Sequence, residues 1–423
     1  MREDFLHYLW KYKKIDILNL CTINKEKIQI VNVGQYLETA GPDFFNAQLT
    51  IGGQKWAGNV EIHLKSSDWY VHNHERDDAY ENVILHVVWE HDMEIFRKDN
   101  SVIPVLELKN FVDPELVNKY QFLITPKSWI FCEKDIGKTD VFTLKNWQER
   151  LFFERLERKS MPVLELLSQT NNDWEAVLFC LLAKNFGLNT NGEAFLKMAS
   201  SIPFLVIRKE SFDHLNLEAL FYGGIGLLDD EKEDVYFKEL KARFDYLTYK
   251  YQLEWNNFEQ VHFFKHRPDN FPTIRLAQLA SVYHQQHNLF SKLISLNSIK
   301  EVYALFEVFV ADYWESHYVF DKISPTKKKK LSHSFIDLIV INTIVPLRFS
   351  YAKNQGKDIL EDLIVLLEDV GSEKNVIMEK FASFGIKLTN AFDSQSLLQL
   401  KNEYCNKSKC MDCVIGINLL KNQ

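Results

Sequence analysis

The stretch GPDFFNAQLTIGGQKWAGNVEIHLK, residues 41–65, determines how the N-terminal part of the chain is interpreted. Apolar and polar residues alternate on both sides of Gly52-Gly53, the pattern of two strands joined by a tight hairpin turn. Because side chains alternate between the faces of a strand, Glu61, His63 and Lys65 share one face, and the aliphatic residues between them face the core. The sequence therefore predicts a hairpin with an acid, an imidazole and an amine on one face.

The neighbouring segments extend this hairpin to an α-β-β-β-α-β order. Residues 3–13 carry a helical apolar stripe, and residues 27–34 alternate as a strand. The polar stretch 74–83 predicts a short helix, and residues 83–92 are rich in the β-branched residues that strands favour.

The rest of the chain has a helical pattern. From about residue 140 onward, apolar residues recur three and four positions apart. We therefore expect an α+β protein with an αβββαβ domain at residues 1–125. A larger, mostly α-helical domain is expected at residues 126–423.

Charge argues against general attraction to nucleic acid. The 423-residue chain has a formal net charge of −8, and residues 1–125 hold 13 lysines and arginines against 19 aspartates and glutamates. A phosphate backbone gains no overall electrostatic attraction from such a surface. Any nucleic-acid contact must use local basic patches, and residues 145–159 and 324–330 are candidates, although solvated surface is the commoner role of such stretches.

The sequence indicates a reduced, cytoplasmic environment. The first residues are charged and contain no apolar run of signal-peptide length, and the apolar run 335–347 is interrupted by Asp337, Asn342 and Pro346. We therefore expect neither secretion nor membrane insertion. Six cysteines are too few for a disulfide scaffold in a chain of this length.

Two carboxylates are expected to meet on the hairpin. Asp43 follows Gly41-Pro42 at the start of the first strand, and the hairpin brings this position beside Glu61 on the second. A pair of carboxylates suits a hard cation such as Mg²⁺, which takes oxygen ligands, and His63 or Lys65 could then orient a water molecule. The alternatives are structural: Asp43 as a turn residue and His63 as a hydrogen-bonded histidine of the sheet.

The αβββαβ order, with Pro42-Asp43 opening one strand and Glu61-x-His63 on the next, resembles the core of the PD-(D/E)XK nuclease superfamily. The resemblance implies Mg²⁺ bound by Asp43 and Glu61, a contribution from Glu3 in the first helix, and cleavage of DNA or RNA phosphodiesters. The superfamily has lysine where this chain has His63. The resemblance then implies that Lys65 acts in its place, or that the site is altered or inactive.

A second resemblance extends over the whole chain. The segments GPDFFNAQLTIGG, GNVEIHLKSSDWYVHNHERDDAY, FFKHRPDNFPTIRLAQLA and YCNKSKCMDCVIGINLL are similar to a bacterial family catalogued as domain of unknown function 2851, common in Bacteroidetes. This resemblance implies that the chain is one unit and names no reaction.

Two other functions remain open. One is a catalytically inactive interaction module with a nuclease-like fold. The other is a zinc-dependent hydrolase that would use the histidines of the N-terminal part, namely His63, His72, His74 and His86. The string His72-Asn73-His74 does not have the spread of an HNH nuclease motif, but its position after the third strand places it near the mouth of the site.

The C-terminal cysteines predict a metal site. Cys405, Cys410 and Cys413 are spaced C-x₄-C-x₂-C, and a two-residue gap lets both thiolates of a turn face one ion. A closed tetrahedral site needs a fourth ligand, for which we favour Cys132 in a polar segment over Cys180 in an apolar helix. Zinc and a [4Fe-4S] cluster both fit, and zinc is slightly preferred.

One loop of the helical part carries two arginines before an apolar helix. Arg267 and Arg275, within residues 265–280, could bind an anion near the start of that helix or form a structural clamp between helices.

Overall fold

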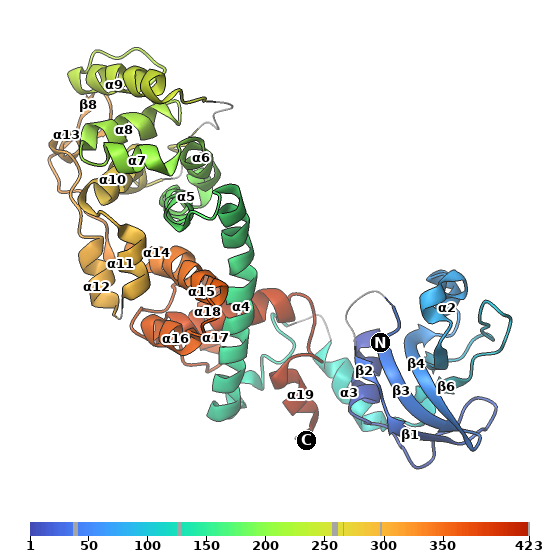
Figure 1. The fold of residues 1–423 in the computed structure, drawn as a ribbon. Helices are drawn as coiled ribbons and strands as arrows, with labels where there is room; N and C mark the ends of the chain where they lie inside the picture. Colours follow the sequence, from blue (N-terminus) through green and yellow to red (C-terminus); the bar gives the residue numbers. More distant parts are fainter. Residues whose placement is uncertain (37–40, 125–127, 256–260, 265, 297, 422–423) are drawn as a thin grey trace. The chain divides into compact units, whose positions relative to one another are not determined.

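The computed structural model describes residues 1–36, 41–124, 128–255, 261–264, 266–296 and 298–421. The chain packs as two compact units (Figure 1). Unit 1 consists of residues 1–147, 380–386 and 400–423, and unit 2 of residues 148–379 and 387–399. The expected boundary at residue 125 lies outside the described residues. The cysteine-bearing end, which the sequence pattern had grouped with the helical part, packs in unit 1.

Unit 1 is built on a mixed sheet with the order β1-β3-β4-β5-β6, and β2 pairs with β3 at one end. β3 is antiparallel to β1 and β4, whereas β5 is parallel to β4 and β6. Figure 1 shows β1, β3 and β4 side by side. The strands are β1 (Ile28–Asn32), β2 (Gln35–Tyr36), β3 (Phe44–Ile51), β4 (Gln54–Lys65), β5 (Val83–Glu90) and β6 (Val105–Glu107).

The predicted hairpin is present as β3 and β4. Gly52 and Gly53 have φ values of 59° and 89°, the left-handed region that a two-residue turn requires and that glycine adopts without strain. In the antiparallel register Phe44 pairs with Val60, so Asp43 comes opposite Glu61. A bulge at Asn46, with φ of 54°, shifts the register between this pair and the hairpin turn.

The connection from β4 to β5 differs from the expected helix at residues 74–83. It contains α2 (Asp68–Val71) and two 3₁₀ turns, His74–Arg76 and Asp78–Tyr80. Asn73 between them is left-handed, with φ of 59°, a conformation that asparagine tolerates better than most residues. The chain therefore reverses between His72 and His74.

Two N-terminal helices and the returning C-terminal segment complete unit 1. Helices α1 (Glu3–Lys11) and α3 (Pro114–Leu123) bury aromatic residues, and Phe5 stacks on Tyr120 with ring centroids 4.1 Å apart. Met411 and Leu420, from the C-terminal segment that includes α19 (Val414–Lys421), belong to the same hydrophobic core as the sheet.

In the residues of unit 2 that the structure describes, the secondary structure is helical except for the short pair β7 (His317–Val319) and β8 (Lys322–Ile323), as expected from the apolar periodicity. Its core is one large hydrophobic cluster. Helix α4 begins in unit 1, and α17 extends into unit 1. The helices in chain order are α4 (Val141–Gln169), α5 (Trp174–Phe186), α6 (Leu188–Ser201), α7 (Phe204–Glu210), α8 (His214–Gly223), α9 (Val235–Tyr251), α10 (Pro272–Gln285), α11 (Leu289–Ser295), α12 (Ile299–Leu305), α13 (Asp312–Glu315), α14 (His333–Ile339), α15 (Val345–Asn354), α16 (Leu360–Glu368), α17 (Val376–Ser383) and α18 (Ala391–Gln399).

The apolar run that the sequence showed as interrupted forms one continuous helix. A π turn, Val340–Ile344, joins α14 to α15 and absorbs Pro346 without breaking the helix. Residues 333–354 are the one described helix long and apolar enough to cross a membrane, and 78% of the apolar window is buried inside the structure. That burial is typical of a core helix.

Candidate metal-binding active site

The two predicted carboxylates meet where β3 begins beside β4. The backbone N–H of Asp43 donates to Oε2 of Glu61 at 3.1 Å, and the backbone N–H of Ile62 donates to Oδ2 of Asp43 at 2.9 Å. Each carboxylate is thus held by the opposite strand. Only 5% of Glu61 is exposed, so its position is rigid. The expectation that both carboxylates converge is confirmed by these contacts.

Three histidines gather beside Glu61. The ligand nitrogens of His63, His72 and His74 all lie within 4.8 Å of one another. His63 projects from β4, whereas His72 and His74 come from the loop after α2, where the left-handed Asn73 brings their rings within 5.4 Å. His63 is buried, His74 is half-buried and His72 is exposed, so the cluster opens to solvent on one side.

The distances within this cluster match those of metal ligands. Oε1 of Glu61 lies 3.4 Å from Nε2 of His63 and 3.4 Å from Nε2 of His74, and Nε2 of His63 lies 3.1 Å from Nδ1 of His72. Ligands about 2.0 Å from a tetrahedral Zn²⁺ are about 3.3 Å apart. Nε2 of His74 is buried and, apart from the contact with Oε1 of Glu61, makes no hydrogen bond to any described residue.

A fourth histidine orients the first. Nδ1 of His63 lies 2.8 Å from Nε2 of His86 on the neighbouring strand β5. Because one ring nitrogen is engaged there, Nε2 of His63 faces the cluster. Metal-binding histidines usually have such a hydrogen bond on the nitrogen opposite the metal.

The first helix contributes His7, which the sequence analysis missed. Nε2 of His7 lies 3.2 Å from Oδ2 of Asp43, and Nδ1 lies 3.4 Å from the hydroxyl of Tyr36. Glu3, one turn earlier on the same helix face, interacts electrostatically with His7 and Asp43. The Glu3/His7 spacing of four residues on one helix was the available sequence indication.

Burial is the largest single influence on the pKa of Glu61, His63 and His7. Burial, reinforced by the charge of Asp43, raises the pKa of Glu61 to about 9. Burial also lowers the pKa of His63 to about 3, with the nearby histidines adding to the effect. Burial opposes protonation of His7, but Asp43 outweighs it and raises the pKa of His7. A bound cation would stabilise the ionised Glu61 and the neutral imidazoles together.

Aromatic rings hold the histidine loop against the sheet. His74 stacks on Tyr80 with centroids 3.7 Å apart and on His63 at 5.3 Å, and Trp69 meets His74 edge-on at 5.3 Å. Trp69 also contacts His86 at 5.6 Å. The loop therefore has a packed wall behind the site, which fixes the ring of His74.

Lys65, the remaining predicted site residue, is not brought into the cluster. It pairs with Glu90 in the β4–β5 register, its side chain is exposed, and among the described residues it forms no ion pair. The structure thus brings together Asp43, Glu61, His63 and, by electrostatic interaction, Glu3.

The donor set fits a transition-metal ion better than Mg²⁺. Imidazole nitrogens suit Zn²⁺, Fe²⁺ and similar ions, whereas Mg²⁺ prefers oxygen ligands and retains several waters. His63, His72 and His74 would hold the ion, with Oε1 of Glu61 beside it. The simpler alternative is a hydrogen-bonded chain of neutral histidines, in which the buried Nε2 of His74 makes only the 3.4 Å contact with Oε1 of Glu61.

A second group of possible metal ligands lies elsewhere in unit 1. Cys132, Cys405, Cys410 and Cys413 all line one small cavity. Burial, followed by the charges of the other cysteines, raises the pKa of Cys132 and Cys405. All four are free thiols. The chain therefore brings the predicted fourth cysteine, from a segment far away in sequence, to the same cavity as the other three.

Comparison with known proteins gives a family but no activity. Searches of the curated proteins and of the solved structures each found no match. One family model, described as a protein of unknown function (DUF2851), matches residues 3–376 and therefore excludes the three C-terminal cysteines. Because this match covers most of the chain, the protein belongs to the DUF2851 family.

Proposed function

We propose that the protein is a metal-dependent phosphodiesterase that cleaves nucleic acid, with its metal at the histidine cluster of unit 1. The observation that carries the proposal is the position of Glu61, whose Oε1 lies 3.4 Å from the nitrogens of both His63 and His74 while its Oε2 bonds the backbone of Asp43. The carboxylate of Glu61 thus contacts two imidazoles and the backbone N–H of the residue that carries the second carboxylate.

The fold supports a nucleic-acid substrate. An antiparallel β3–β4 hairpin followed by a β5 strand parallel to β4, with acidic residues on both hairpin strands, resembles the PD-(D/E)XK arrangement that the sequence suggested. The imidazole donors lead us to propose Zn²⁺ in place of the Mg²⁺ expected from two carboxylates, and the carboxylates of the same site would also suit Mn²⁺. When bound, the ion would polarise the phosphoryl oxygen and make a bound water more acidic.

The chain's own groups suit the proton transfers of hydrolysis. The oxygen of a water molecule forms the new bond to phosphorus, and the bond from phosphorus to one sugar oxygen breaks. A base accepts the proton of the attacking water and later releases it to solvent, and the departing oxygen takes a proton from solvent. The His7–Asp43 pair, at 3.2 Å, is our candidate for the base, since Asp43 orients the imidazole and stabilises its protonated form.

The test is cleavage of labelled single- and double-stranded DNA and RNA by protein that has been stripped with chelator and then supplied with Mg²⁺, Mn²⁺ or Zn²⁺. We expect cleavage with Mn²⁺ or Zn²⁺ and none with chelator. Glu61→Gln should be inactive, and Glu90→Gln, an exposed carboxylate on β5, serves as the matched control. Metal binding without cleavage of any substrate would favour the inactive interaction module.

We propose in addition that the four cysteines hold a second, structural metal centre. Burial and then Cys413 raise the pKa of both Cys405 and Cys410, and the nearby cations Lys401 and Arg2 oppose this shift only in part. Four thiols that line one cavity suit either Zn²⁺ or a [4Fe-4S] cluster, and zinc stays slightly preferred, as from the sequence.

A further inference from the structure

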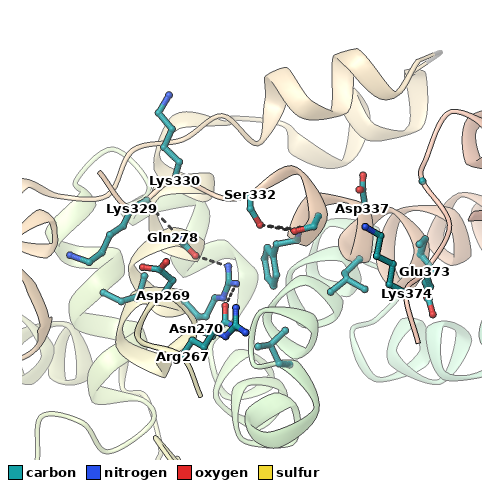
Figure 2. Close-up of a pocket in the computed structure, with 18 of the residues that line it drawn as sticks. Arg267, Asp269, Asn270, Gln278, Lys329, Lys330, Ser332, Asp337, Glu373 and Lys374 are labelled. Atoms are coloured by element: carbon teal, nitrogen blue, oxygen red, sulfur yellow. Dashed lines mark hydrogen bonds between the residues drawn. The ribbon is translucent and has the colours of Figure 1, made fainter. Parts of the chain in front are cut away.

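A wide cavity of unit 2 is strongly basic. It measures about 850 Å³ and lies between the start of α10, the segment before α14 and residues 371–375. Its wall contains seven lysines and arginines against three aspartates and glutamates, in a chain whose net charge is −8. Figure 2 shows the charged residues Arg267, Lys329, Lys330 and Lys374 around it. Such a concentration of cations attracts an anionic ligand.

One cation of the wall is buried without a counter-ion. Only 6% of Arg275 is exposed, and it forms no ion pair with any described residue. Its guanidinium donates to the neutral side chains of Gln278 at 2.8 Å and Asn270 at 2.5 Å. The guanidinium also lies 3.5 Å over the ring of Phe335, and Nε–H has no hydrogen-bond partner. Buried charges are rarely left uncompensated in proteins.

The nearest carboxylate is engaged elsewhere. Asp269 pairs with Lys327 at 2.6 Å and accepts a hydrogen bond from the hydroxyl of Tyr318 at 3.0 Å. Burial lowers the pKa of Arg275 to about 10, so the group remains charged at neutral pH. A structural clamp would explain the contacts to Asn270 and Gln278, as the sequence analysis considered. It does not explain the uncompensated charge or the free Nε–H.

A second buried cation of the wall, Lys329, also lacks a counter-ion among the described residues. Only 4% of Lys329 is exposed, and its ammonium donates to the backbone carbonyls of Trp314 and Glu315, with no carboxylate partner among the described residues. Its neighbour Lys328, together with Arg267 and Lys374, is exposed and free of ion pairs within the described chain. These three side chains can reach a ligand without breaking an existing contact.

Apolar side chains line the cavity as well. A bare inorganic ion would not require a wall that combines apolar and charged groups. The apolar residues are Leu188, Ile274, Phe335, Leu338 and Ile341. A volume of this size suits a ligand with several ring systems, and pockets for small molecules combine apolar walls with a few charged groups. A nucleotide has both an anionic phosphate and an aromatic base.

We propose that this cavity binds the phosphate of a nucleotide-sized phosphate ester, with Arg275 as the buried contact and Arg267, Lys328 and Lys374 at its opening. The phosphate would supply the missing acceptor for Nε–H and a charge opposite to that of Arg275. The ester belongs either to a free nucleotide or to a nucleic-acid strand. The site is in unit 2 and does not depend on the activity proposed for unit 1.

Isothermal titration of the full chain tests this site, with EDTA present so that the histidine cluster is metal-free. The probes are inorganic phosphate, adenosine monophosphate, a short single-stranded oligonucleotide and an acidic peptide. We expect saturable binding of the monophosphate with one site per chain, or of the oligonucleotide alone if a strand is the source. No binding of any phosphate probe, or equal binding of the acidic peptide, would overturn the proposal.

Two sets of variants assign the binding to the cavity. The triple variant Arg267→Ser, Lys328→Ser and Lys374→Ser should bind at least about tenfold more weakly, since each charged contact contributes strongly. The control triple Lys300→Ser, Lys322→Ser and Lys357→Ser removes the same charge from exposed positions outside the cavity and should bind as the wild type does. Equal binding by both triples would contradict the assignment.

Arg275→Met separates a binding role from a clamp. Methionine keeps much of the volume and removes the buried charge, so we expect binding to be lost while the melting temperature stays the same or rises. A lower melting temperature with binding retained would identify Arg275 as a structural clamp and remove it from the site.

Discussion

Nε2 of His74 lies 3.4 Å from Oε1 of Glu61, although Glu61 is fixed in the middle of β4 and His74 belongs to the loop that follows it. Oε1 of Glu61 also lies 3.4 Å from Nε2 of His63, so one carboxylate oxygen contacts imidazoles from two separate elements. A carboxylate and imidazoles that converge in this way are arranged as ligands of a common ion are.

Glu61→Gln and Asp43→Asn should each abolish metal-dependent cleavage without unfolding the protein. Each amide keeps an oxygen that can accept the backbone bond from Asp43 or Ile62, so the hairpin is preserved, but the charge needed to stabilise a cation is lost. We expect cleavage rates to fall by about two orders of magnitude or more. Rates and melting curves are measured together, with Glu90→Gln as the control. Wild-type rates in either variant would rule out these carboxylates as site residues.

Transition metals should stabilise the protein more than Mg²⁺ does. An ion that binds only the folded state at a hundred times its dissociation constant adds about 2.7 kcal/mol to the free energy of unfolding. We expect Zn²⁺ or Mn²⁺ to raise the melting temperature of chelator-stripped protein and an equal concentration of Mg²⁺ to leave it unchanged. A larger shift with Mg²⁺ would indicate that the carboxylates, and not the histidines, bind the ion.

His74→Asn should remove this metal-dependent shift, whereas His91→Asn should keep it. His91 bonds the hydroxyl of Ser66 at 2.8 Å and lies outside the group of three histidines, so it is a matched control in the same unit. Metal content measured on both variants checks the result directly.

The hairpin could be predicted from sequence because its determinants are local. Alternation and the Gly52-Gly53 turn set the register near the turn, and the bulge at Asn46 then shifts it by one residue and brings Asp43 opposite Glu61. The same reasoning identified His63 and the side of the strand that it occupies.

The histidine loop could not be predicted because its shape depends on contacts distant in sequence. His72 and His74 converge only because Asn73 is left-handed and because Trp69 and Tyr80 pack against the rings. Nothing in a polar stretch specifies those contacts, so a helix was the natural expectation there. His7 was missed for the same reason, since only the packing of α1 on β4 brings it to Asp43.

The return of the C-terminal segment to unit 1 was also beyond local patterns. Lys401 donates to the backbone carbonyl of Trp129 at 2.9 Å and lies 4.2 Å over its ring. This contact joins residues far apart in sequence, and helical periodicity carries no information about it. The choice of Cys132 as partner of the late cysteines came from the polarity of its surroundings.

Cys410→Ser should abolish metal binding at the cysteine site. If the four cysteines hold a [4Fe-4S] cluster, anaerobically purified wild type is brown and contains iron and sulfide, and the variant is colourless and melts earlier. Colourless wild type with one zinc per chain would support the mononuclear site instead. Cys21→Ser is the control, since Cys21 lies outside the cysteine cavity. Metal-free wild type with the same melting temperature as the variant would end the proposal for this centre.

The stability of unit 2 should depend on pH through Glu218. This side chain is fully buried in α8, where Tyr236 and Trp314 donate to its Oε2 at 2.7 Å and 2.9 Å, and burial raises the pKa of its carboxyl to about 7. The unfolded chain has the ordinary value of 4.5. Between pH 4.5 and 7 the folded state therefore holds a proton that the unfolded state releases, so stability is highest below pH 4.5 and falls as pH rises through 7.

Glu218→Gln should remove this dependence because glutamine mimics the protonated acid and still accepts both hydrogen bonds. Relative to wild type, the variant should gain on the order of 2 to 3 kcal/mol in free energy of unfolding between pH 5 and pH 8. Urea unfolding followed by circular dichroism at the two pH values measures the difference. Glu231→Gln, at an exposed position of the same unit, should change stability equally at both. A wild type and a Glu218→Gln variant with parallel pH profiles would mean that Glu218 is ionised in the folded protein, and that its two hydrogen bonds outweigh the effect of burial.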